Sequence, residues 1–113
     1  MLNQIVLVGR LTRDVVVNKT DSGKKIANLS LAIPRSFKNM DGIYDTDYID
    51  CILWENTAIN TSEYCHKGDI VGIKGRVQSK VEEKNGHNEN ILEVVAEKVT
   101  FLTTKKEKQK EDI

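Results

Sequence analysis

The stretch that decides the fold is Thr46-Asp47-Tyr48-Ile49-Asp50-Cys51-Ile52-Leu53-Trp54, because its side chains sort onto two distinct faces. Successive side chains of a β-strand point to opposite sides, so a strand here gathers Ile49, Cys51 and Leu53 on one face. The other face receives two large rings, Tyr48 and Trp54, with Asp50 and Ile52 between them. The pattern predicts a strand that covers a core with one side and presents aromatic rings on the other.

Tyr48 and Trp54 lie six residues apart, which on a strand that rises about 3.3 Å per residue separates them by roughly 20 Å. That distance spans several stacked or splayed bases. An exposed ring can stack on any base, and each stack contributes about 1 to 3 kcal/mol to the binding of single-stranded nucleic acid. A second interpretation stays open, because Tyr and Trp are common in strands as partly buried packing residues. Judged from this strand alone, ordinary packing is the more frequent case.

The length of 113 residues suits one domain with one hydrophobic core. The 17 basic and 17 acidic residues cancel, so the overall charge neither favours nor excludes a nucleic-acid partner, and any basic surface must be local. No apolar run approaches the length of a membrane span, and residues 1–4 lack the basic start and apolar region of a signal peptide. We therefore expect a cytoplasmic protein with no membrane partner.

The residues offer little to an enzyme or a metal site. Cys51 and Cys65 are too few for a disulfide framework and lack the paired spacing of zinc ligands, so we expect both to be reduced. His66 and His87 fall at a helix end and in a turn, and the chain has no glycine-rich loop of the kind that cradles phosphates. We expect no catalytic residues, no metal and no cofactor.

Further strands flank the deciding stretch. Residues 5–11 form an apolar run in which Gly9 predicts a bulge or bend, and the strand can continue through residues 15–17. Residues 27–33 alternate as the second strand, and residues 35–42 form a loop that carries Phe37.

One helix is expected within residues 55–67, stopped by Gly68. Residues 71–80 and 91–102 make a hairpin around Asn85-Gly86, with Val94, Ala96 and Phe101 turned to the core. The predicted core positions are Leu7, Leu29, Leu31, Ile49, Cys51, Leu53, Val71, Ile73 and Val77.

Five strands with one short helix between the third and the fourth predict an all-β fold, namely the OB-fold. This is a partly open Greek-key barrel whose face binds oligonucleotides or oligosaccharides. We assign residues 1–104 to this domain. Residues 105–113 form a polar, charged tail that we expect to be disordered.

Over residues 1 to about 104, the chain resembles the bacterial single-stranded DNA-binding proteins. The first strand of that family is similar to residues 2–14 and its second to residues 27–32, and the end of its helix is similar to residues 62–68. Residues 75–80 and 93–95 match as well. Each piece is short, but their order and spacing together are specific. The resemblance implies an OB-fold subunit that forms a homotetramer, partly through its first strand, and wraps single-stranded DNA in replication, recombination and repair on the nucleoid.

The resemblance also implies a set of DNA-binding residues. Three rings, Phe37, Tyr48 and Trp54, match places where the family has base-stacking aromatics. Basic side chains fall where the family tends to contact phosphates, and strand alternation adds one lysine to them. These basic residues are Arg10, Arg35, Arg76 and Lys80, with Lys74 added by alternation. A solvated charged face remains the alternative for any one of them.

Departures from the family pattern bear on affinity and on partners. Glu82 and Asn90 stand where the family usually has aromatics, and the carboxylate of Asp50 lies between Tyr48 and Trp54, where it repels phosphates. The family commonly ends in an acidic tip closed by Pro-Phe that recruits repair and replication enzymes. This chain ends in Ile113, so recruitment through such a tip is doubtful. These departures keep a second function open, an OB-fold module of replication accessory type that uses the same face for a protein partner.

Overall fold

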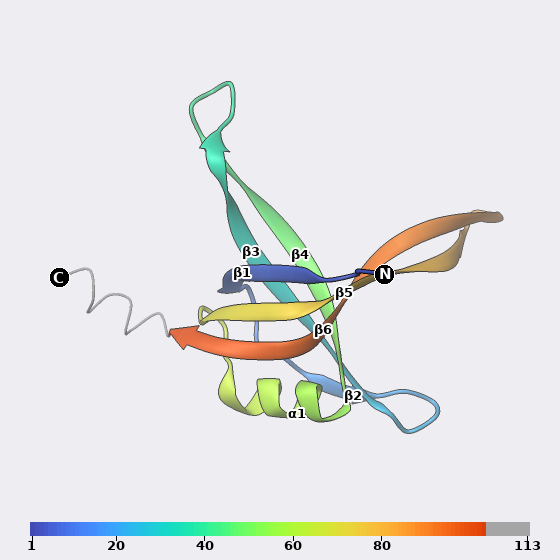
Figure 1. The fold of residues 1–113 in the computed structure, drawn as a ribbon. Coiled ribbons are helices and arrows are strands. Elements are labelled where there is room, and N and C mark those ends of the chain that lie inside the picture. The colour runs from blue at the N-terminus through green and yellow to red at the C-terminus, as the bar shows by residue number, and fades with distance from the viewer. Residues whose placement is uncertain (104–113) are drawn as a thin grey trace.

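The computed structural model describes residues 1–103, and Figure 1 shows a small barrel with one helix beneath it. The predicted tail, residues 105–113, lies outside the described residues, as does Thr104. The elements are β1 (Ile5–Leu11), β2 (Val17–Lys19), β3 (Lys25–Lys38), β4 (Tyr44–Trp54), α1 (Glu55–Tyr64), β5 (Ile70–Lys84) and β6 (His87–Thr103). Two long hairpins, β3–β4 and β5–β6, project from the barrel in different directions (Figure 1).

The barrel is built from β1, β5, β6, β4 and β3, hydrogen-bonded in that order. A second pairing between β1 and β3, at Arg10↔Ala32 and Leu11↔Leu31, closes it. The pairing of β4 with β6 is parallel, and the other pairings are antiparallel. This arrangement confirms the predicted OB-fold. The continuation expected after the first strand is interrupted at residues 12–16 and resumes as the three-residue β2, which pairs with β3 alone.

Gly9 lies where two strands of the barrel cross. The sequence predicts a bulge or a bend there, and the bulge is wrong, because the β1–β5 register runs without a shift from Ile5 to Arg10. A Cβ atom on Gly9 would lie 2.8 Å from Cγ1 of Ile33 and 2.9 Å from the carbonyl oxygen of Ala32. Glycine is therefore required because β3 crosses directly over β1 where the barrel closes.

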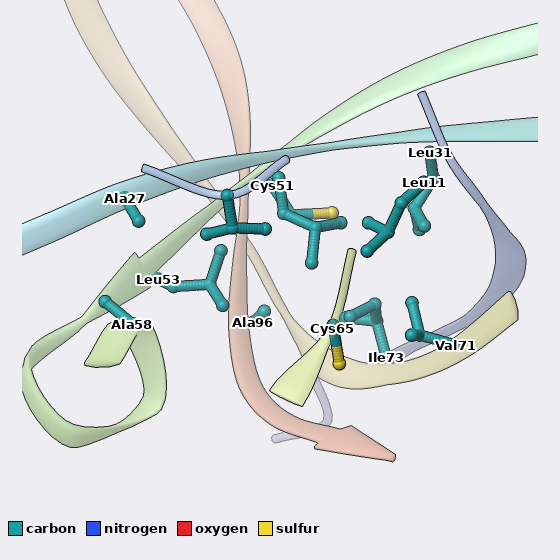
Figure 2. Packing of buried hydrophobic residues seen from close by; sticks show 12 residues of the cluster. Leu11, Ala27, Leu31, Cys51, Leu53, Ala58, Cys65, Val71, Ile73 and Ala96 are labelled. Atoms are coloured by element: carbon teal, nitrogen blue, oxygen red, sulfur yellow. The ribbon is translucent and has the colours of Figure 1, made fainter. Parts of the chain in front are cut away.

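The core gathers on the inner face of these strands (Figure 2). Six of the nine predicted core residues are buried, whereas Leu7 and Ile49 are half-buried and pack against the core. Val77 is half-buried and lies outside the cluster, and Phe101 is 42% exposed, so the expected burial of both was wrong. Ala96, which the sequence also predicts to face the core, and five further residues from the strand ends, the helix and the connections complete the cluster. They are Leu11, Val15, Ala27, Ala58, Cys65 and Ala96.

The helix α1 lies within residues 55–67, as predicted, but Gly68 does not stop it. Its last residue is Tyr64, and the backbone N–H of Cys65 donates to the carbonyl oxygen of Thr61. Gly68, with a φ of +94°, instead forms the turn into β5, where its N–H bonds the carbonyl oxygen of Leu11. Burial of Ala58 and Thr61 fixes the helix against the barrel, as its weak helix formers require. Among residues 1–103, no helix is long and apolar enough to cross a membrane.

The tight crossing at Gly9 gives a stability prediction. Gly9→Ala should lower the free energy of unfolding by about 1 to 3 kcal/mol, because the new methyl group overlaps the backbone of β3. Urea unfolding followed by circular dichroism measures the change. Gly72→Ala is the matched control, since a Cβ there would meet its nearest atom, Cδ1 of Leu102, at an ordinary 3.8 Å. Equal unfolding midpoints for the two variants would contradict the role of Gly9.

Candidate nucleic-acid interface

The two rings of β4 lie on one face, as the alternation predicts. Tyr48 is 72% exposed and Trp54 is 37% exposed, whereas Cys51 and Leu53 on the other face are fully buried. Asp50 is exposed and Ile52 is half-buried between the rings. The strand therefore presents aromatic side chains to solvent while its opposite side closes the core.

A third ring extends this face. β4 begins at Tyr44, and the even spacing Tyr44, Thr46, Tyr48 places the Tyr44 ring, 53% exposed, on the same side. By strand rise it lies about 13 Å from Tyr48 along the strand. The Nζ of Lys38 lies 5.7 Å from its ring centroid, within cation–π distance. The predicted strand begins at Thr46 and so omits Tyr44, although the same alternation extends to this ring two residues earlier.

Phe37 lies on the same hairpin, and its ring is 63% exposed. The loop predicted there is wrong, because β3 continues to Lys38. The β3–β4 register shifts between Pro34 and Lys38, so that residues 35–37 bulge out of the ladder. The hairpin thus carries both Phe37 and Tyr44 beyond the body of the barrel.

Arg35 is held by carboxylates on the opposite side of β4 from the rings. Its Nη2 donates to Oδ1 of Asp47 at 2.9 Å, and its Nε lies 3.2 Å from both oxygens of that carboxylate. Its Nη1 lies 3.8 Å from Asp45. Because Asp45 and Asp47 alternate with Tyr44 and Tyr48, this cluster belongs to the other face of the hairpin. A DNA contact by Arg35 stays a prediction, and the structure does not bring it to the ring face.

Arg10 borders a groove beside Tyr48. The groove, of about 360 Å³, lies where β1 meets β3 and β4, and its walls include Arg10, Pro34 and Tyr48. The Nη1 of Arg10 donates to the carbonyl oxygen of Gly68 at 2.9 Å, so part of the guanidinium is committed to the turn before β5. Lys74 is exposed on β5, between Val6 of β1 and Lys98 of β6. The structure thus brings Arg10, but not Lys74, beside a ring.

The remaining predicted cations belong to a chain of polar contacts along β5 and β6. Nη1 of Arg76 donates to Oε1 of Gln78 at 2.7 Å, and Nε2 of Gln78 donates to Oε1 of Glu93 at 3.0 Å. Lys80 then lies 3.1 Å from Glu93 and 2.9 Å from Glu82. A groove of about 370 Å³ separates this hairpin from β3 and β4 and is lined by both Lys80 and Asp50. Lys80 and the ring face of β4 therefore border one groove.

Asp50 does not stand alone between the rings. Its Oδ1 lies 3.7 Å from Nη2 of Arg13, and both side chains are largely exposed. Arg13 lies in the connection between β1 and β2, directly after Thr12, whose N–H donates to the carbonyl oxygen of Ser30 on β3. Strand periodicity does not apply in this connection, so no sequence pattern could have placed Arg13 beside Asp50. The repulsion expected from Asp50 is partly offset by this neighbour.

Comparison with known proteins gives a consistent result. The family model described as "Single-strand binding protein family" matches residues 2–102. Single-stranded DNA-binding protein B of Bacillus subtilis is 45% identical over 106 residues, which cover 93% of this chain and 94% of that protein. The single-stranded DNA-binding proteins of Oceanobacillus iheyensis and Halalkalibacterium halodurans are each 43% identical, over 93% and 90% of this chain. The chain spans 66% and 61% of the length of those two relatives.

The Arg35 cluster predicts a titration that NMR can follow. The hydrogen bonds from Arg35 lower the pKa of the Asp47 carboxyl. Arg35→Gln should therefore raise that pKa toward its usual range, measured from the carboxyl ¹³C shift of Asp47. Lys38→Gln removes the same charge three residues away, where the ammonium lies over Tyr44, and should move the Asp47 titration less. An equal effect of both variants would mean that general charge, and not the Arg35 contact, sets the pKa.

Proposed function

The chain belongs to the single-strand binding protein family, and from this membership we propose that it binds single-stranded DNA, coating and protecting it in replication, recombination and repair. The observation that carries the proposal is the exposure of Tyr48 and Trp54 on one face of β4, beside the groove that Lys80 borders. Sequence-independent binding needs rings that stack on any base and cations along the backbone. We propose this role in the bacterial cytoplasm, on nucleoid DNA, and as a binding protein without enzymatic activity.

In this proposal the rings of β4 define the path of the bases. Bases stack on Trp54 and Tyr48, and the β3–β4 hairpin continues the path to Tyr44 and Phe37. Contacts to phosphates come from the basic residues Arg10, Arg35, Arg76 and Lys80, which the family resemblance assigns, and from Lys74, which strand alternation adds. Each stack contributes about 1 to 3 kcal/mol, so the rings supply most of the affinity if the cations are partly neutralised.

We further propose that the protein acts as a homotetramer. β1 pairs with β3 only at Arg10 and Leu11, which leaves one edge of its first five residues without a strand partner among residues 1–103. Its outward side chains, Val6 and Val8, are 67% and 52% exposed. An unpaired apolar strand favours pairing with a second copy. A tetramer also gives DNA a path long enough to wrap.

The rings provide the direct test of the proposal. Trp54→Ala and Tyr48→Ala should each weaken binding of fluorescein-labelled dT oligomers by about 1 to 3 kcal/mol, with a smaller loss for Phe37→Ala. Fluorescence anisotropy measures the affinity, and quenching of Trp54 in the unchanged protein reports stacking. Tyr64→Ala is the matched control, because this ring is 71% exposed on α1, away from β4.

Two outcomes would count against DNA binding on this face. An equal loss of affinity in Trp54→Ala and Tyr64→Ala would mean that the rings of β4 have no special role. If dT oligomers neither bind nor quench Trp54, while Trp54→Ala abolishes association with a protein partner, the face is a protein-docking surface. The carboxylates of Asp50 and Glu82 in the groove are the observation that favours this second function.

The assembly has its own test. Native mass spectrometry at micromolar concentration should show a tetramer for the unchanged chain. The double substitution Val6→Lys and Val8→Lys should yield smaller species, because it places charges on the apolar face of β1. Val81→Lys is the matched control, since this valine is 64% exposed on the β5–β6 hairpin. A monomer in the unchanged chain would contradict the assembly and would also make wrapping impossible.

A further inference from the structure

Lys80, a predicted phosphate contact, is already balanced by carboxylates within the chain. Its Nζ lies 2.9 Å from Oε1 of Glu82 and 3.1 Å from Oε2 of Glu93. An ammonium has three N–H donors, and these two carboxylates accept from two of them. The positive charge is therefore largely neutralised before any phosphate arrives.

The two carboxylates are not equivalent. The side chain of Glu82 is 39% exposed, whereas that of Glu93 is only 13% exposed. Glu93 also accepts a hydrogen bond at 3.0 Å from Nε2 of Gln78, the residue opposite it on β5. That bond and the neighbouring Lys80 lower the pKa of Glu93, so its carboxylate is ionised at neutral pH. Glu93 is thus a fixed anion in a fixed position.

The groove around Lys80 strengthens this effect. Its ionisable lining residues are three carboxylates, Asp50, Glu82 and Glu93, and two lysines, Lys80 and Lys84. Acidic groups come from both walls, because Asp50 belongs to β4 and the other two carboxylates belong to the β5–β6 hairpin. Among these lining residues negative charge exceeds positive charge by one, an excess that Arg13, 3.7 Å from Asp50, partly offsets.

We propose that, in the free protein, the carboxylate of Glu93 occupies the position beside Lys80 that a DNA phosphate takes in the complex. Single-stranded DNA then binds in this groove when a phosphate replaces the Glu93 carboxylate beside Lys80. The inference rests on the proposed function and adds a residue that sets its affinity and salt dependence. Because the new ion pair replaces an existing one, Lys80 contributes little net affinity and releases few counterions. Glu93 thus lowers the affinity for DNA through its ion pair with Lys80.

Glu93→Gln tests the exchange, since glutamine keeps the shape and the contact with Gln78 while removing the charge. Binding of labelled dT oligomers, followed by anisotropy, should tighten roughly 2- to 10-fold at low salt. The slope of log affinity against log salt should steepen by about 0.7, because the released lysine now displaces a counterion of the single strand. A purely structural role for Glu93 would not steepen this slope.

Matched variants separate the exchange from a general change in charge. Glu83→Gln makes the same charge change on the same hairpin, next to Glu82, where strand alternation turns the side chain to the other face, and it should leave the affinity and the salt slope nearly unchanged. In a Lys80→Ala background, Glu93→Gln should not tighten DNA binding, since Glu93 then has no lysine with which to pair. Thermal unfolding of each variant confirms that it is folded.

The outcomes distinguish this inference from the function on which it rests. The exchange is wrong, and DNA binding stands, if the unchanged chain binds dT oligomers but Glu93→Gln binds them with the same affinity as Glu83→Gln. The same conclusion follows if Glu93→Gln still tightens binding in the Lys80→Ala background. If only Glu93→Gln binds, the exchange is supported in its strongest form. If the folded unchanged chain and Glu93→Gln both fail to bind, the proposed function and this inference fail together.

Discussion

Closure of the barrel depends on the close approach of β1 and β3 at Gly9. The two strands share only the pairs Arg10↔Ala32 and Leu11↔Leu31, supported by the bond from the N–H of Thr12 to the carbonyl oxygen of Ser30. Leu11 and Leu31 are 1% and 0% exposed, so this short seam also seals the core. A side chain at Gly9 would hold the strands apart and open the seam. The position of β3 in the molecule follows from this contact.

Closure of the barrel also determines which side of the candidate interface faces solvent, because β3 pairs with β4 in a fixed register. Leu31 lies opposite Ile49 and Leu29 opposite Cys51, so the residues that β3 buries fix which side of β4 faces inward. A slip of one residue would expose Cys51 and bury Tyr48, which exchanges a small core side chain for a large polar ring. Exposure of the rings is therefore a consequence of how the core packs, and the same contacts that stabilise the barrel orient its surface.

Local periodicity explains what the sequence could predict. The alternation of residues 49–53 identified the buried face of β4 and the two rings, and the order of the strands identified the barrel. Arg13 and the pairing of Glu93 with Lys80 could not be foreseen, because one lies in a turn and the other depends on the register between distant strands. Gly68 does not stop α1, because it serves the turn into β5. Phe101 pairs with Val71 near the end of β6, where its ring remains partly exposed.

Charge and aromatic surface are distributed differently over this protein. Four basic side chains each lie within 4.0 Å of a carboxylate, and these are Arg13, Arg35, Arg76 and Lys80. The rings of Tyr44, Tyr48 and Trp54 keep 53%, 72% and 37% of their surface exposed. Stacking responds weakly to salt, whereas each phosphate contact is opposed by counterions. Because Arg13 and Lys80 are already paired with carboxylates beside this face, stacking remains its principal attraction for a single strand. In the function that we propose, the line of rings along β4, more than the pattern of charges, therefore defines the direction in which bound bases run.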